Sequence, residues 1–233
     1  MSHEVIAAII AAVFSLASVV LSVSTRFSLD RRTRREERRV FMDQYRGPLI
    51  HAAYNLQSRL HTILTKPDFL DVLCSGDNTS RERRYYIDNT AYVVAQYFAW
   101  AEIIRREIFQ LDLGEVEGNR SLSALLDAMY GHWQDDRYGK TLRVFAGEQR
   151  AIGEAMLTGS GSAGERQVLG YGEFLKRVDA LPFINDFRTE LGHRDAVLGA
   201  IERLRVVQHA LVDLTSLLDP GVVYVPASNL KKA

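Results

Sequence analysis

The sequence predicts a mainly α-helical protein, with one N-terminal transmembrane helix followed by a cytoplasmic bundle of about five or six helices and at most one or two very short strands. Three observations support this: an uncharged apolar segment near the N-terminus, a cluster of arginines directly after it, and apolar residues that recur at spacings of three and four. The predicted organisation is an anchor at 1–25, a basic juxtamembrane helix or linker at 26–47, a helical domain at 48–219 and a flexible tail at 220–233.

The anchor is predicted from residues 5–23, which carry no charge and comprise 16 apolar residues and three serines. As a helix this segment is roughly 29 Å long, which matches a hydrocarbon core about 30 Å thick. A cleaved signal peptide is the alternative. Such peptides have a basic start and a shorter apolar core, whereas only His3 and Glu4 offer side-chain charge before this segment. We therefore expect a retained single span.

The arginine cluster predicts the orientation of the span. Residues 26–39 contain seven arginines and three acids, and no lysine or arginine precedes the apolar segment. Under the positive-inside rule, the N-terminus lies outside the plasma (inner) membrane and the C-terminal domain is cytoplasmic. Each base near an anionic leaflet contributes about 1 kcal/mol, so the cluster also fits lipid-headgroup binding, with orientation alone as the simpler interpretation. The expected headgroup contacts are Arg31, Arg32, Arg34, Arg35, Arg38 and Arg39.

Small residues recur along one face of the predicted span at steps of four, four, three and four. This spacing lets two helix backbones approach closely, which favours self-association in a bilayer. The alternative is that small residues are merely tolerated in a monomeric anchor. The expected self-association face consists of Ala7, Ala11, Ser15, Ser18 and Ser22.

Composition excludes several classes of function. The formal net charge is zero, but residues 40–233 hold 22 bases and 25 acids, so the domain is mildly acidic and nucleic-acid binding is not favoured. The lone Cys74 excludes an intramolecular disulfide framework, and no CxxC or HExxH spacing of a zinc site is present. No metal or cofactor is predicted. Five lysines against 24 arginines indicate a GC-rich bacterial genome.

The central helix of the bundle is predicted at 81–111. Residues 91–101 are apolar on every side except at Gln96, and such a helix is buried, although this apolar stretch is too short for a second span. Other expected elements are a helix break or kink at Gly47 and Pro48, a short strand at 142–145 and a long helix at 195–218.

Glu102 precedes Arg105 and Arg106 by three and four residues. This spacing is typical of intrahelical ion pairs, which we prefer to a catalytic acid.

The glycine-rich region 147–172 is the expected home of a site, because loops on a rigid scaffold carry most binding residues. Its GSGSAG run at 159–164 matches GxGxxG but lacks the strand before it and the helix after it that a dinucleotide site needs. The candidate polar site is Glu148, Gln149, Arg150 and Glu154. A structural helix is the simpler interpretation, since Glu148 and Glu154 are six residues apart and do not share a helix face.

No catalytic constellation is evident in the sequence, so the favoured function is a membrane-tethered interaction, scaffold or sensor domain. The expected partners are membrane lipids, a second copy of the chain and an unidentified protein. The alternative is a membrane-anchored enzyme or ligand-binding effector with a pocket between the helix at 81–111 and the region 147–172.

Overall fold

The computed structural model describes residue 33 and residues 45–74, 80–108, 116–158 and 167–233. The chain divides into two compact units, Met1–Met42 and Asp43–Ala233, and all of these described residues except residue 33 belong to the second unit. The predicted anchor, its small-residue face and the arginine cluster lie outside the described residues. Within the described ranges, no helix is both long and apolar enough to cross a bilayer.

The second unit is mainly helical, as predicted, and its described strands form one short antiparallel pair in which Leu157 faces Val168. The first described helix covers residues 45–65. The elements that follow are α2 (Pro67–Leu73), α3 (Arg81–Ile108), α4 (Val116–Gln134), η1 (Asp136–Tyr138), α5 (Ala146–Ala155), β1 (Leu157–Thr158), β2 (Gln167–Val168), α6 (Tyr171–Arg177), η3 (Val178–Ala180), α7 (Pro182–Leu191), α8 (Arg194–Gly199), α9 (Ile201–Leu218) and η4 (Ala227–Asn229).

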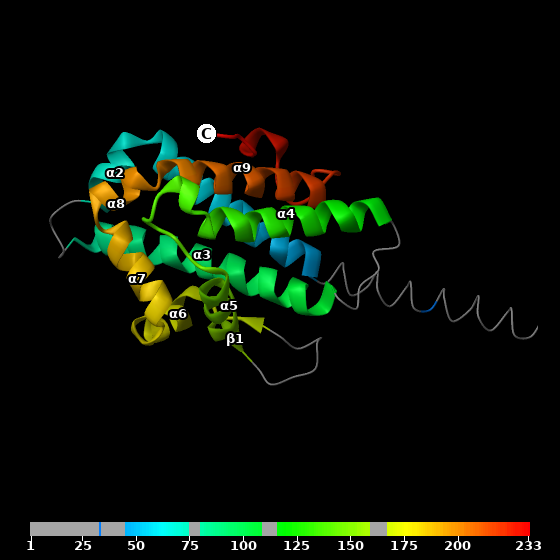
Figure 1. Ribbon diagram of the computed structural model, residues 1–233, viewed down its shortest axis with the longest axis horizontal. Helices are drawn as coiled ribbons and strands as arrows, with labels where there is room; N and C mark the ends of the chain where they lie inside the picture. The colour runs from blue at the N-terminus through cyan, green and yellow to red at the C-terminus, as the bar shows by residue number, and fades with distance from the viewer. Residues whose placement is uncertain (1–32, 34–44, 75–79, 109–115, 159–166) are drawn as a thin grey trace, which may run out of the picture. The chain divides into compact units, whose positions relative to one another are not determined.

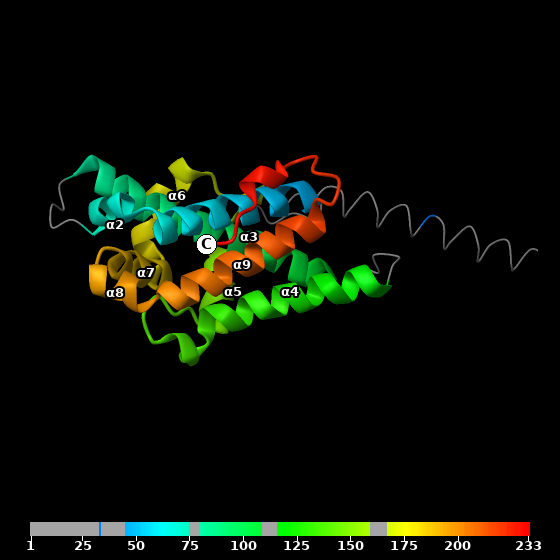
Figure 2. The ribbon, with the colours of Figure 1, turned by 90° about the horizontal axis from the view of Figure 1, so that it is seen from above.

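The helix at 45–65 and helices α3, α4 and α9 run along the long axis of this unit, and the shorter α5, α6 and α7 lie to one side of them (Figures 1 and 2). Helix α3 contacts α2, α5, α6 and α7, while α4 contacts α9. Between Ala91 and Ile104, the side chains of α3 are buried except for the partly exposed Tyr92, Gln96 and Trp100. The predicted buried central helix is therefore confirmed.

Three local predictions differ from the structure. The chain is helical through Gly47 and Pro48, so no break occurs there. A Cβ on Gly47 would lie 3.3 Å from a ring carbon of Tyr224, so this glycine makes room for the tail. The predicted strand at 142–145 is irregular, because its amides bond to Trp133 and Glu190 rather than to a neighbouring strand. The predicted helix at 195–218 is divided into α8 and α9.

The tail begins with a turn built around Asp219, which is 5% exposed. Its carboxylate accepts hydrogen bonds of 2.8 to 2.9 Å from the amides of Val223, Tyr224 and Val225. Burial alone would raise the pKa of Asp219, but these three bonds and the charge of Arg46 outweigh it and lower the pKa.

The rest of the tail lies on two buried glutamines, Gln57 of the first described helix and Gln208 of α9. The Gln208 amide donates to the Gln57 side-chain oxygen at 3.1 Å and to the Lys231 carbonyl at 2.7 Å. The Gln57 amide donates to the Asn229 carbonyl at 3.3 Å. The sequence predicts that residues 220–233 form a flexible tail. In the structure they contact the helix at 45–65 and α9, the first and last long helices of the unit.

Helix α5 approaches α3 most closely at Gly153. A Cβ at this position would lie 2.7 Å from the Phe98 carbonyl oxygen and 3.1 Å from the Glu102 Cβ. The first of these atoms belongs to the backbone of a buried helix and has little freedom to move. Glycine is therefore required where the two helices cross.

We expect Gly153→Ala to destabilise the protein by about 1 to 3 kcal/mol, because the added methyl group forces α5 away from α3. The matched control is Gly147→Ala in the same helix, where a Cβ meets nothing within 4 Å. That change should be neutral or stabilising by up to about 1 kcal/mol, since alanine favours helix. Denaturant unfolding of both variants tests the prediction, and equal stabilities would contradict it.

Candidate functional site

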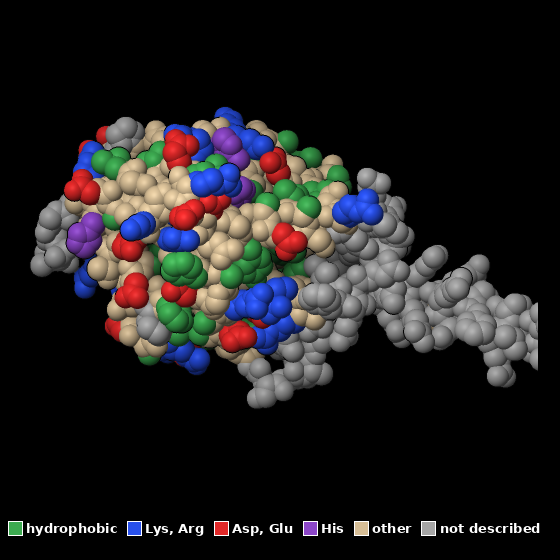
Figure 3. Space-filling model, viewed as in Figure 1, with side chains coloured by type: hydrophobic (Ala, Val, Ile, Leu, Met, Phe, Trp, Pro, Cys, Tyr) green, Lys and Arg blue, Asp and Glu red, His purple; other side chains and the backbone are tan. Residues whose placement is uncertain are grey.

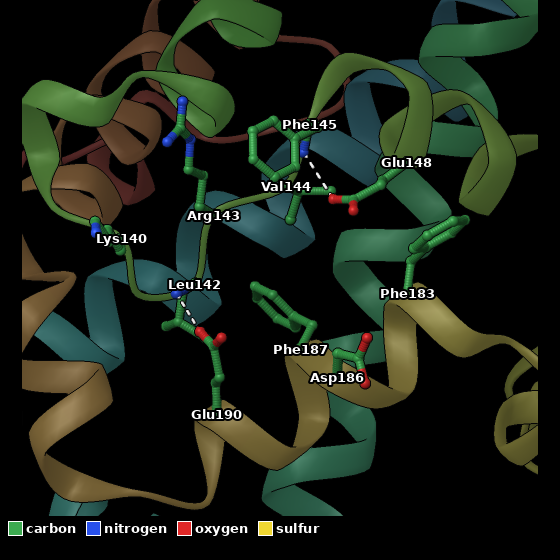
Figure 4. Close-up of a pocket in the computed structure, with 10 residues that line it drawn as sticks. All are labelled: Lys140, Leu142, Arg143, Val144, Phe145, Glu148, Phe183, Asp186, Phe187 and Glu190. Carbon is green, nitrogen blue, oxygen red and sulfur yellow. Dashed lines mark hydrogen bonds between the residues drawn. The ribbon is translucent and has the colours of Figure 1, made fainter.

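A hollow of about 290 Å³ lies between the segment 140–148 and helix α7 (Figure 4). Its floor is apolar, because Leu142, Val144 and Phe187 are buried. Two large aromatic side chains remain accessible beside it, with Phe145 49% and Phe183 40% exposed. The lining consists of Lys140, Leu142, Arg143, Val144, Phe145, Glu148, Phe183, Asp186, Phe187 and Glu190.

The surroundings of this hollow are mixed in character. Figure 3 shows hydrophobic side chains reaching the surface over α5 and α7, with acidic and basic side chains among them. The surface therefore combines apolar contact area with charges of both signs.

The segment that lines the hollow is held in place by Arg203 of α9, whose side chain is fully buried. Its guanidinium donates to four main-chain carbonyls at 2.6 to 3.3 Å, and none of the ion pairs among the described residues includes it. The acceptors belong to His132, Trp133, Gly139 and Thr141.

Two of these four carbonyls lie in the last turn of α4, where helix carbonyls lack intrahelical partners and carry partial negative charge. Burial lowers the pKa of Arg203, and repulsion from Arg143 lowers it further. The guanidinium nevertheless stays protonated at neutral pH, because arginine does not lose its proton in proteins. It therefore acts as a cationic cap on α4 and a clamp on the loop after it.

The clamped loop contains backbone conformations that side chains rarely adopt. Gly139 has a φ of 85° and Leu142 a φ of 49°. The leucine is tolerated because its side chain is buried and its amide donates to the Glu190 carboxylate of α7. Arg203 and Glu190 thus both hold the loop in place.

Most of the charged side chains at the hollow already have partners within the protein. Glu148 accepts a 2.9 Å bond from the Phe145 amide, and Arg143 donates to the Gln134 carbonyl at 2.6 Å. The Arg143 guanidinium also lies 4.6 Å from the centre of the Phe145 ring. Among the described residues, Lys140 and Asp186 have no such partner. The hollow therefore offers an apolar floor, two aromatic rings and one uncommitted charge of each sign.

The four residues of the predicted polar site differ in burial and in their hydrogen-bond partners. Glu148 caps the first turn of α5 and lines the hollow. Gln149 is buried and donates to the carbonyls of Tyr130 and Val144 at 3.1 and 2.9 Å. Arg150 is exposed. The contacts of Glu148 and Gln149 are those of a structural helix start.

Glu154, the fourth member, pairs with Arg106 of α3. Arg106 also donates to Glu102 at 2.6 Å, and Arg105 donates to both Glu102 oxygens at 2.7 and 2.8 Å. The predicted intrahelical ion pairs of Glu102 are confirmed. Burial favours the neutral form of this fully buried carboxyl, but the two arginines outweigh that effect and lower its pKa.

The hollow does not lie where the alternative function places a pocket. The hollow is lined by residues 140–145, by Glu148 of α5 and by α7, whereas α3 contributes no lining residue and contacts α5 directly at Gly153. The GSGSAG run at 159–164 falls outside the described residues. No group of three or more metal-ligating side chains occurs within the described ranges.

Sequence reasoning did not identify Arg203, Phe183, Asp186 or Glu190. A signal for Arg203 exists, because it precedes the buried residues Val207, Ala210 and Leu214 at steps of four, three and four and so belongs to an apolar stripe. No local signal links α7 to the segment 140–148, since their approach is a tertiary contact.

Comparisons with protein families, curated proteins and solved structures find no match for the chain.

We expect Arg203→Met to destabilise the protein by about 3 kcal/mol or more, because several buried carbonyls lose their donor at once. Arg205→Met is the matched control two residues away. Arg205 is partly exposed and pairs with an exposed Glu202, so its loss should cost roughly 0 to 1 kcal/mol. Denaturant unfolding measures both effects, and similar losses in the two variants would show that Arg203 is not a clamp.

Proposed function

We propose that the chain is a single-pass membrane protein whose helical domain is a cytoplasmic interaction, scaffold or sensor module. The supporting observation in the domain is how its polar groups are used. Buried polar side chains such as Glu102, Gln149 and Arg203 bond to helices and loops of the domain itself, whereas the two phenylalanines beside the hollow remain exposed. This arrangement suits recognition of another molecule more than acid–base chemistry.

The anchor part of the proposal rests on residues 5–23 and the arginines that follow. Their length, lack of charge and asymmetry fit one span with the C-terminal domain inside the cell. The small-residue face of Ala7, Ala11, Ser15, Ser18 and Ser22 supports a homo-oligomer, and the six arginines from Arg31 to Arg39 support contact with anionic headgroups.

The partner proposed for the hollow is a protein segment that places an apolar side chain between Phe145 and Phe183. The buried Leu142, Val144 and Phe187 provide an apolar floor for it, and Lys140 and Asp186 can pair with charges that flank it. Aromatic anchors surrounded by polar groups are typical of interface hot spots.

The orientation can be tested by cysteine labelling in a Cys74→Ser background. In spheroplasts, a membrane-impermeant maleimide should label Ser2→Cys directly and Ser228→Cys only after the membrane is permeabilised, because residue 228 belongs to the cytoplasmic domain and is exposed. The reverse pattern would contradict the orientation. Recovery of the intact chain in the soluble fraction would contradict the anchor.

The recognition surface can be tested with a photo-crosslinking amino acid at position 183 in cells. We expect one discrete protein adduct that is lost when Phe145→Ala is added and kept when Leu217→Ala is added, since Leu217 is an exposed residue of α9 outside the hollow. Thermal unfolding should show that both variants remain folded. An adduct that is indifferent to Phe145→Ala would overturn the assignment of this surface.

A further inference from the structure

A second hollow of about 440 Å³ lies between the helix at 45–65 and α3. Its walls are two helix faces, because the lining positions are spaced by one, three or four residues along each helix. The lining residues are Tyr54, Asn55, Ser58, Arg59, Thr62, Asn89, Tyr92 and Val93. We refer to this hollow as the Arg59 groove.

Arg59 is the single charged residue in the lining of the groove. Within the described part of the chain, its guanidinium has no hydrogen bond and no ion pair. It lies instead 5.3 Å from the ring centre of Phe69 and 5.9 Å from that of Tyr86. Stacking on aromatic rings orients a guanidinium without neutralising its charge or using its N–H donors.

Two acidic residues of α3 near the groove bond to residues other than Arg59. Asp88, next to Asn89, pairs with Arg188 of α7 at 2.6 Å. Glu82 accepts a 2.7 Å hydrogen bond from the Tyr86 hydroxyl. Among the described residues, Arg59 therefore forms no direct ion pair, and the Glu82 carboxylate is bonded to the Tyr86 hydroxyl rather than to the guanidinium.

The remaining polar groups of the lining are neutral, and several are uncommitted. Among the described residues, the side chains of Asn55, Ser58 and Asn89 make no hydrogen bond. The Tyr54 hydroxyl accepts from the Asn229 amide at 3.3 Å, which leaves its own hydrogen free to donate. The groove thus presents hydroxyl and amide donors around one oriented cation.

We propose that the Arg59 groove binds the phosphoryl group of a small molecule. The guanidinium fork matches two phosphoryl oxygens, and the neighbouring hydroxyl and amide groups can donate to the others. A monoanionic carboxylate would leave more of these donors unused. The phosphoryl group can come from a free phosphorylated metabolite or from a phospholipid headgroup, which share this chemistry.

Binding is tested with the full chain in a zwitterionic detergent, by calorimetric titration with sn-glycerol 3-phosphate, AMP and inorganic phosphate. We expect saturable binding of at least one probe, weakened about tenfold or more by Arg59→Gln, since a bidentate charged contact is lost. The matched control is Arg84→Gln, which removes an exposed arginine of α3 outside the groove and should leave affinity unchanged.

A second variant separates binding from folding. Ser58→Trp fills the groove without removing Arg59, so it should also abolish binding while the thermal midpoint stays close to that of the unaltered chain. Absence of binding for all three probes, or equal affinities of the Arg59→Gln variant and the unaltered chain, would overturn the proposal. So would full binding by Ser58→Trp.

The source of the phosphoryl group is distinguished by comparing the chain in a detergent without a phosphoryl group with the chain in nanodiscs that contain phosphatidylglycerol. Competition by phosphatidylglycerol against the soluble probe, dependent on Arg59, assigns the groove to a lipid headgroup. Equal affinity for the soluble probe in the detergent and in the nanodiscs assigns it to a free metabolite.

Discussion

One buried charge, that of Arg203, determines how the second half of the helical unit is arranged. Its four carbonyl acceptors belong to the end of α4 and to the loop that follows, while Arg203 itself lies in α9. A buried guanidinium is costly unless its donors are satisfied, and a buried helix end is costly unless its carbonyls are. The Arg203 guanidinium satisfies the carbonyls at the end of α4, and those carbonyls in turn satisfy the guanidinium. The position of the loop, and hence of the hollow against α7, follows from this match.

The same principle applies to residues of the predicted polar site. Glu148 and Gln149 use their side chains to complete the start of α5, and Glu154 joins the arginine pair that neutralises Glu102. In a helical unit with many short connections, each buried helix end needs a donor or acceptor. Glu148, Gln149 and Glu154 are accordingly used for structure, whereas Asp186 and Arg59 have no hydrogen bond or ion pair among the described residues and line the two hollows.

The sequence predicts the helical class and the burial of α3, because those properties depend on periodicity and composition. It also predicts the Glu102 ion pairs, because their partners are three and four residues away. It does not predict the hollow or the Arg59 groove, since each joins segments that are distant in the chain. Its prediction of a helix break at Gly47 and Pro48 fails, and the glycine there has a tertiary role, because a Cβ would crowd the ring of Tyr224, which is distant in sequence.

The contacts of the tail have a consequence for the order of events during synthesis. Arg46 donates to the Leu218 carbonyl and Gln57 to the Asn229 carbonyl, and each pair is separated by 172 residues. At about 5 to 20 residues per second, the first helix waits on the order of 10 to 30 s for these partners. The unit therefore completes these contacts only after residues up to 229 have been translated. Until then, the polar groups of Arg46 and Gln57 that bond to the C-terminal part of the chain remain without these acceptors.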